Sequence, residues 1–300
     1  MPIVVTKTIL KGLSVSEAMR RQVISLSKQT TIDSSINYLI KYKVNALLTT
    51  DETDQPVGVV SKTDIMGAYY AALPAESPLE HIMSSPPLFC HPQDSLESAL
   101  DKMRSRGIYR LYAIEPDSEK VVGVLAYPDI VGLLYRYCHS CEYSILGRRR
   151  KDQDNNDVHR FKVKEVMTPS VKAFVEDESL LQIMEGLSVY RFGAVLITDR
   201  NNVPTGVVSK TDLILTYKHG VSSDVNAKAI MSSPVRACEE TDFLENAIQT
   251  MIFSEVHRLF VYKGAQQNIV GVLSLSDAAR LRSGSCHACV SSRIKVDDHN

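Results

Sequence analysis

Apolar residues recur along the chain with two different periods. Segments 96–103 and 244–251 place them at positions i, i+3, i+4 and i+7, which predicts helices with one face toward a core. Each segment is followed by a short apolar run, a polar turn and a second apolar run, as in Leu111–Ile114 and Val121–Leu125. Two short apolar runs joined by a polar turn predict a pair of strands.

The same order of elements is expected in every quarter of the chain. Ala46–Leu48 and Ala194–Ile197 are the first strands of the first and third quarters, and a second helix follows each strand pair. Each unit is therefore predicted to consist of helix, strand, strand and helix, after a short extended lead-in. This order indicates an α/β fold built from four similar units.

A sequence repeat supports this division. Gly58–Asp64 returns unchanged as Gly206–Asp212, 148 residues later, and in each half an aspartate recurs 65 residues further on, at Asp129 and Asp277. Repetition at a fixed offset indicates copies of one structural unit. A unit of about 60 residues has only a marginal core of its own because its surface is large for its volume, so the units are expected to fold as pairs.

The composition excludes some classes of protein. The 300 residues include 44% hydrophobic and 23% charged residues with a net charge of −1, which gives no overall attraction to nucleic acid. No apolar run approaches the roughly 20 residues that cross a bilayer, and residues 1–12 lack the apolar core of a signal peptide. We therefore expect a cytoplasmic protein with no membrane or nucleic-acid partner. Acidic residues after the basic run 148–151 favour a solvated linker over a nucleic-acid contact there.

The second helix of a unit begins with a defined spacing of polar residues. A serine precedes an aspartate by three residues in the pairs Ser61/Asp64, Ser209/Asp212 and Ser274/Asp277. In such a capping box the hydroxyl and the carboxylate satisfy free backbone N–H groups at the helix start. Capping alone would explain a single copy, but repeated copies, each after a Gly-containing apolar strand, also indicate a ligand site.

These segments resemble the cystathionine beta-synthase (CBS) domain family, whose units end in a G-h-h-S/T-x-x-D segment and pair into Bateman modules. The stretches Val256–Leu259 and Val270–Asp277 are similar to the corresponding region of the gamma subunit of AMP-activated protein kinase. The resemblance covers nearly the whole chain. It implies two Bateman modules, each a pseudo-two-fold pair of β-α-β-β-α units, and the sensing of adenosine compounds without catalysis.

The repeat also gives the expected boundaries. The first module covers residues 1–141, with units at about 13–72 and 77–137, and a polar linker covers 142–160. The second module covers residues 161–290, with units at about 161–219 and 225–283, and a polar tail covers 291–300.

The helix starts are candidate nucleotide sites. A helix amino terminus suits a phosphate because it presents free N–H groups and the positive end of the helix dipole. Hydroxyl groups that add donors there are Ser61, Thr63, Ser209, Thr211, Ser274 and Ser276. A carboxylate repels phosphate but accepts hydrogen bonds from a ribose diol. The resemblance implies that ribose is held by Asp64, Asp129, Asp212 and Asp277.

The second quarter departs from this pattern. Its segment Ala126–Asp129 has no hydroxyl where the other units have serine, although Pro128 suits a helix start. The site of this quarter is expected to bind phosphate weakly or to stay empty. Substitution of Asp129 should then reduce ligand affinity less than substitution of Asp277.

Arginine occurs where the first strand begins in the even quarters, at Arg110 and Arg258, and the aligned odd positions, 65 residues earlier, are Asn45 and Gly193. A guanidinium binds a phosphate through two hydrogen bonds; a solvated charge at a strand edge is the alternative, chiefly at Arg110. Weaker basic candidates are Lys43, Arg191 and His257. Cations at these sites would favour nucleotides over S-adenosylmethionine, whose sulfonium they repel.

The cysteines suggest a second kind of site. Two C-x-x-C pairs follow the last helix of each half, Cys138/Cys141 and Cys286/Cys289. Four thiolates in two such pairs match a structural zinc site, with cluster ligation or a dithiol redox pair as alternatives. The pairs share a metal only if the ends of both halves meet, within one chain or across a dimer. Cys90 and Cys238 also repeat, but they lie in lead-in strands, where a small buried residue is the simplest interpretation.

Taken together, these patterns predict a regulatory protein, not an enzyme, that binds AMP, ADP or ATP in clefts between paired units. A nucleotide that bridges two units favours one arrangement of them. We expect a homodimer that reports to an unidentified regulated protein. The alternative is a metal- or redox-sensing scaffold that uses the C-x-x-C pairs, with zinc as the metal, and retains only vestigial nucleotide sites.

Overall fold

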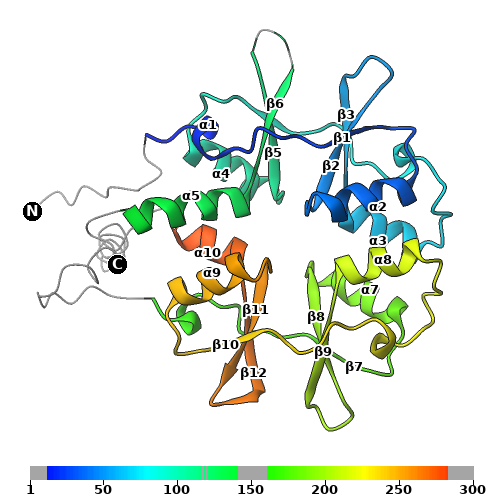
Figure 1. Cartoon of the computed structure of the whole chain (residues 1–300), viewed down its shortest axis with the longest axis vertical. Helices are drawn as coiled ribbons and strands as arrows, with labels where there is room; N and C mark the ends of the chain where they lie inside the picture. The colour runs from blue at the N-terminus through cyan, green and yellow to red at the C-terminus, as the bar shows by residue number, and fades with distance from the viewer. Residues whose placement is uncertain (1–11, 117, 119, 141–160, 283–300) are drawn as a thin grey trace, which may run out of the picture.

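The computed structural model of the chain describes residues 12–116, 118, 120–140 and 161–282. It contains four three-stranded sheets, each with its own helices, which confirms the predicted α/β fold of four units. The units are numbered 1 to 4 in chain order. Figure 1 shows them around a common centre: unit 2 lies beside unit 1, unit 4 lies beside unit 3, and the first pair lies above the second in this view.

The four units have the same order of elements. Unit 1 comprises β1 (Ser25–Ser27), α2 (Ile32–Lys41), β2 (Ala46–Thr50), β3 (Pro56–Ser61) and α3 (Lys62–Tyr70). Unit 2 comprises β4 (Phe89–Cys90), α4 (Leu96–Ser105), β5 (Arg110–Ile114), β6 (Val121–Ala126) and α5 (Tyr127–Ser140). Unit 3 comprises β7 (Ala173–Val175), α7 (Leu180–Val189), β8 (Ala194–Thr198), β9 (Pro204–Ser209) and α8 (Lys210–Lys218). Unit 4 comprises β10 (Ala237–Glu239), α9 (Leu244–Phe253), β11 (Arg258–Lys263), β12 (Ala265–Ser274) and α10 (Leu275–Arg282).

The register of the hairpins corrects one alignment made from the sequence. Ala46 pairs with Ser61 in unit 1, whereas Arg110 pairs with Ala126 in unit 2. Arg110 therefore corresponds to Ala46 and not to Asn45. Units 3 and 4 differ in the same way, with Ala194 opposite Ser209 and Arg258 opposite Ser274. The hairpins of the even units are one residue longer, so a single offset cannot align both of their strands.

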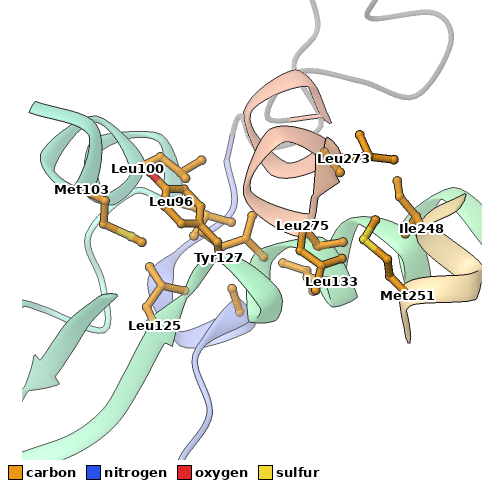
Figure 2. Close-up of a cluster of buried hydrophobic side chains, with 14 of the residues drawn as sticks. Leu96, Leu100, Met103, Leu125, Tyr127, Leu133, Ile248, Met251, Leu273 and Leu275 are labelled. Carbon is orange, nitrogen blue, oxygen red and sulfur yellow. The ribbon is translucent and has the colours of Figure 1, made fainter. Parts of the chain in front are cut away.

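Two large apolar cores run between the halves of the chain. One joins units 2 and 4, where α5 packs against α10 and Leu100, Leu125, Met251 and Leu273 are buried; Figure 2 shows this cluster. The other joins units 1 and 3, where α3 packs against α8. A third, smaller cluster of Leu48, Tyr112 and Val124 joins unit 1 to unit 2. Each unit thus shares its main core with a unit of the opposite half, an arrangement that the repeat alone did not reveal.

The interface between units 1 and 3 is symmetric in its polar contacts as well. The rings of Tyr69 and Tyr217 stack with centroids 5.1 Å apart. Each hydroxyl donates a hydrogen bond to a backbone carbonyl of the opposite half, that of Val221 for Tyr69 and that of Leu73 for Tyr217. A buried tyrosine hydroxyl needs such a partner, and here both partners lie across the interface.

The lead-in segments are exchanged between the two units of each half. They contain the short helices α1 (Val15–Ala18), η1 (Leu79–His81), η2 (Val163–Glu165) and η3 (Ala227–Ala229). The segment before unit 1 forms a backbone bridge from Arg20 to Val124 of unit 2, and the segment before unit 2 forms one from Ser84 to Val59 of unit 1. The second half repeats the exchange with the bridges Thr168–Val272 and Ser232–Val207.

This exchange explains the glycine of the repeated G-h-h-S/T-x-x-D segment. The methionine of each incoming lead-in lies directly over the glycine of the strand that receives it. A Cβ atom on Gly206 would lie 2.7 Å from the sulfur of Met231 and 3.0 Å from the carbonyl oxygen of Ser232. The same contact recurs at Gly58, Gly123 and Gly271, with Met83, Met19 and Met167. Glycine is therefore required because another segment approaches its backbone closely.

The two cysteines in lead-in strands belong to the core. Cys90 and Cys238 are buried free thiols in the cluster that joins units 2 and 4, which confirms their interpretation as small core residues. Burial raises the pKa of Cys90 to about 11 and that of Cys238 to about 12, so both stay protonated and unreactive at neutral pH. Within the described part of the chain, no helix has the length and apolar character needed to cross a membrane.

Candidate functional site

The carboxylates of the repeated helix starts cap their own helices with one oxygen. In unit 1 the Oδ2 atom of Asp64 accepts hydrogen bonds from the backbone N–H and the hydroxyl of Ser61, both at 2.7 Å. Asp212 with Ser209 and Asp277 with Ser274 form the same capping arrangement. In unit 2 the backbone N–H of Ala126 donates to Oδ2 of Asp129 at 2.9 Å, and this capping oxygen receives no hydroxyl because residue 126 is alanine. The predicted capping boxes are confirmed at α3 and α8, and the same bonds occur at α10.

The second oxygen of each carboxylate, Oδ1, has a different environment in each unit. Among the described residues, no group donates to Oδ1 of Asp64 or Asp277. Oδ1 of Asp212 accepts a hydrogen bond of 3.1 Å from the hydroxyl of Ser232, in the incoming lead-in. Oδ1 of Asp129 forms an ion pair of 2.7 Å with Nε of Arg20. Within the described residues, units 1 and 4 therefore present an acceptor without a donor, unit 3 one with a neutral partner, and unit 2 one that a charged side chain occupies.

The serine hydroxyls at these helix starts are engaged in the caps, and the next hydroxyls take part in contacts between elements. Nζ of Lys62 donates to the hydroxyl of Thr211 at 2.9 Å, and Nζ of Lys210 donates to that of Thr63 at 2.8 Å. Each lysine is the first residue of its helix, so the amino termini of α3 and α8 reach across to each other. Ser276 contacts Ser274 within unit 4, at 2.7 Å between their Oγ atoms.

The two lysines carry poorly compensated charge. Burial, together with the nearby guanidinium of Arg110, lowers the pKa of Lys62 from 10.5 to about 8 against the opposing effect of Asp212. Burial and Arg258 lower the pKa of Lys210 to about 8 against the effect of Asp64. A buried ammonium group whose nearest partner is a neutral hydroxyl would be stabilised by an anion. Neither lysine was among the residues predicted to bind a ligand, although lysine recurs at this position 148 residues later.

The arginines at the strand starts point into the junction between the units of each half. Nη1 of Arg110 donates to the carbonyl of Ala46 in unit 1 at 3.0 Å, and Nη1 of Arg258 reaches that of Ala194 in unit 3 at 3.5 Å. Neither is the solvated strand-edge charge that was the alternative. A Cβ atom on Gly193 would lie 2.2 Å from Nη2 of Arg258, so any side chain at residue 193 would displace the Arg258 guanidinium from this position.

His257 lies in the same positively charged region. Burial lowers its pKa first, and the nearby charges of Lys62, Arg258, Arg110 and Arg20 lower it further. These cations come from units 1, 2 and 4, so the region lies where the units meet. The other weak candidates differ: Lys43 lies close to His257 but forms an ion pair with Glu255, and Arg191 is an exposed residue with a positive φ of 53° just past the end of α7.

The arrangement suits a ligand with a diol and an anionic group. Free carboxylate oxygens at helix starts accept hydrogen bonds from hydroxyl groups, and the gathered lysine, arginine and helix-terminal N–H groups attract an anion. An available carboxylate oxygen and nearby cations occur together at α3 and α10. They also occur at α8, where the hydroxyl of Ser232 already donates to the carboxylate. At α5 the carboxylate is already paired.

Most of the predicted metal ligands lie beyond the described helices. Cys141, Cys286 and Cys289 lie outside the described residues, and Cys138 lies in the last turns of α5. No group of three or more His, Cys, Asp or Glu side chains that could hold a metal ion occurs within the described part of the chain. The shared metal site therefore stays a prediction.

Comparison with known sequences gives a family match. Residues 15–71, 79–136, 163–219 and 227–284 match the model of the CBS domain. An uncharacterised protein of Methanopyrus kandleri is 25% identical over 124 residues, which make up 41% of this chain and 63% of that protein. The chain thus matches slightly less than two thirds of that relative's length. An uncharacterised protein of Methanocaldococcus jannaschii is 19% identical over 203 residues, 67% of this chain and 68% of its own.

Solved structures show the same fold. A crystal structure from M. jannaschii, described as that of a proposed archaeal homolog of g-AMPK, covers 89% of this chain and 99% of its own, with a TM-score of 0.72 and 14% identity. A CBS domain protein of Pyrobaculum aerophilum, solved in complex with AMP, is 29% identical over 39% of this chain and 90% of its own, with a TM-score of 0.37. The first match establishes the four-unit architecture, and the second is too partial to support an argument about ligands.

Proposed function

The chain belongs to the CBS domain family, and on this premise we propose that it is a non-catalytic regulatory protein that binds adenine nucleotides at the amino termini of α3, α8 and α10. The model of this family matches all four units, and both the fold and the two-module organisation agree with it. AMP, ADP and ATP are the proposed ligands, and Asp64, Asp212 and Asp277 the proposed ribose contacts.

The observation that carries the proposal is the division of each carboxylate at a helix start. One oxygen caps the helix and the other, at Asp64 and Asp277, is free for a ribose hydroxyl in the part of the chain that the structure describes. Cations gather beside these helix starts: Lys62, Lys210 and Arg258 are partly buried, and within the described residues none of them forms an ion pair. A nucleoside phosphate carries a diol and an anion together, so it matches both features.

The proposed mechanism is a shift between two arrangements of the halves. Lys62 and Lys210 each reach from one half to the helix start of the other. A phosphate bound at either helix start would therefore contact a lysine of the opposite half. A ligand shifts a conformational equilibrium only by its difference in affinity for the two states, and a contact made across the halves provides such a difference. The regulated partner, a homodimer and a cytoplasmic location belong to this proposal as expectations.

Calorimetric titration and thermal shifts with AMP, ADP, ATP, adenosine and S-adenosylmethionine would test the proposal. We expect AMP, ADP or ATP to raise the melting temperature with concentration, and the Lys62→Met/Lys210→Met variant to lose about tenfold or more in affinity for that nucleotide, because a charge-assisted hydrogen bond is worth about 1.5–3 kcal/mol. Adenosine affinity should change little. The control is Lys28→Met/Lys228→Met, which removes two lysines from surface ion pairs with Glu52 and Glu176.

The alternative, a metal- or redox-sensing scaffold, has one structural observation in its favour. Helix α5, whose last turns contain Cys138, packs against α10, which precedes Cys286 and Cys289. Adding a chelator to the same thermal-shift series separates the two classes. A large loss of stability with chelator, together with no response to any nucleotide, would favour the metal scaffold and reject the nucleotide proposal.

A further inference from the structure

We infer that Arg20 occupies the ribose position of unit 2 and closes this unit's site, so that the chain has three usable nucleotide sites instead of four. The inference deepens the proposed function and rests on it. The Nε atom of Arg20 lies 2.7 Å from Oδ1 of Asp129, the oxygen that stays free at Asp64 and Asp277 among the described residues.

The backbone fixes Arg20 in this position. Its N–H donates to the carbonyl of Val124 and its carbonyl accepts from the N–H of Val124, both at 2.9 Å. Val124 follows Gly123, under the incoming Met19, and precedes the start of α5. The side chain of Arg20 thus extends from an anchored segment over the helix start. The Asp129 side chain is only 9% exposed, and that of Arg20 is 44% exposed.

In the other three units, the backbone position that corresponds to Arg20 does not carry an arginine. The residues that form the equivalent backbone bridge are Ser84 for unit 1, Ser232 for unit 3 and Thr168 for unit 4. These side chains are short and neutral. The hydroxyl of Ser232 reaches Oδ1 of Asp212, but it can rotate away and bond to a ligand instead. An arginine yields less readily, because its departure would deprive a largely buried carboxylate of the cation paired directly with it.

A second difference in unit 2 acts in the same direction. Ala126 stands where the other units have a serine, so the carboxylate of Asp129 lacks the hydroxyl that donates to the capping oxygen elsewhere. Burial of Asp129 raises its pKa, against the effects of Arg20 and of the Ala126 N–H, which lower it. The ion pair with Arg20 therefore supplies a donor to a carboxylate that lacks the serine hydroxyl, and it occupies the oxygen that a diol would use.

The test counts nucleotide sites by calorimetric titration of the full chain, with the nucleotide that binds the wild-type protein. The wild-type protein should bind no more than three nucleotides. Arg20→Ser/Ala126→Ser, which gives unit 2 the residues of unit 1, should bind one more than wild type. The reciprocal variant Ser84→Arg should bind one fewer, because it places an arginine over Asp64.

The outcomes separate this inference from the proposed function. No binding to the wild-type protein would reject the proposed function itself. Four sites in the wild-type protein, or a wild-type site count in a folded Arg20→Ser/Ala126→Ser variant, would overturn the inference while leaving the proposed function intact. The wild-type count requires no substitution, so a count of four overturns the inference even if a variant fails to fold. Thermal melts of each variant without ligand show whether it is folded.

Discussion

At the scale of single residues, the two oxygens of each aspartate at a helix start have separate environments that a motif cannot distinguish. The S-x-x-D spacing predicts a cap, and the structure shows that the cap uses only Oδ2. The state of Oδ1 depends on residues distant in the sequence, such as Arg20 and Ser232. The aspartates, the capping serines and the arginines could be found from the sequence. Arg20 and the two lysines could not be assigned, because their partners belong to other units.

The lysine pair makes anion binding dependent on pH. With a pKa of about 8, Lys62 and Lys210 lose their charge as the pH rises from 7 to 9. The affinity for the bound nucleotide should fall over this range, and the Lys62→Met/Lys210→Met variant should show a much weaker pH dependence. Titration calorimetry at pH 7, 8 and 9 measures both. A wild-type affinity that stays constant over these pH values would contradict the assignment.

The lowered pKa of the two lysines also affects stability: the stability of the unliganded protein should rise with pH, whereas nucleotide affinity should fall. Between about pH 8 and 10.5 these lysines bind a proton in the unfolded chain but not in the folded one. Stability rises with pH wherever the unfolded state binds more protons. Without ligand, the free energy of unfolding of the wild-type protein should therefore increase relative to that of the double methionine variant across this range, as denaturant titrations at several pH values would show.

At the scale of elements, the order of helices and strands followed from apolar periodicity, since each pattern depends only on neighbours in the sequence. The exchange of lead-ins did not follow, because it joins a segment to the neighbouring unit. Even the glycine of the repeated motif has a reason that lies outside the motif, because a methionine from another segment packs directly against it. The extra residue in the hairpins of the even units did not follow from the sequence pattern either, and it shifted the predicted alignment of Arg110 and Arg258 with the odd units by one residue.

A pair of glycine substitutions tests this explanation. Gly206→Ala should reduce the free energy of unfolding by about 1–3 kcal/mol, the usual cost of overpacking, because the new methyl group meets Met231 and the backbone carbonyl of Ser232. Gly67→Ala, inside α3 with no atom within 4 Å of the added Cβ, should instead stabilise by up to about 1 kcal/mol. Urea denaturation of both variants measures the difference. Equal effects would show that the methionine contact is not limiting.

At the scale of the whole molecule, the two halves depend on each other for their cores. The repeat suggests two independent lobes, yet each large core contains residues from both halves. The stacked tyrosines and the crossed lysines add polar contacts to the same interface. A division into halves therefore describes how the sequence repeats, while the cohesion of the molecule crosses that division.

We accordingly expect the chain to unfold in one cooperative transition. Leu100→Ala, in the core that joins units 2 and 4, should cost about 2–5 kcal/mol and shift this single transition as a whole. Scanning calorimetry checks this by comparing the calorimetric and van't Hoff enthalpies, which agree for a two-state protein. Two resolved transitions, of which Leu100→Ala moves only one, would show that the halves unfold independently.

The exchange of lead-ins also links ligand occupancy to local opening of the chain. Each incoming segment lies over the helix start of the unit that receives it, as Ser84 does beside Val59 in unit 1 and Ser232 beside Asp212 in unit 3. Release of such a segment removes part of the wall of the proposed neighbouring site and so weakens nucleotide binding. Because the coupling is reciprocal, a bound nucleotide makes the release less favourable by the same free energy. The three connecting segments that carry Ser84, Thr168 and Ser232 should thus be the parts of the backbone whose protection from hydrogen exchange depends on a bound nucleotide, whereas the segment that carries Arg20 should not respond.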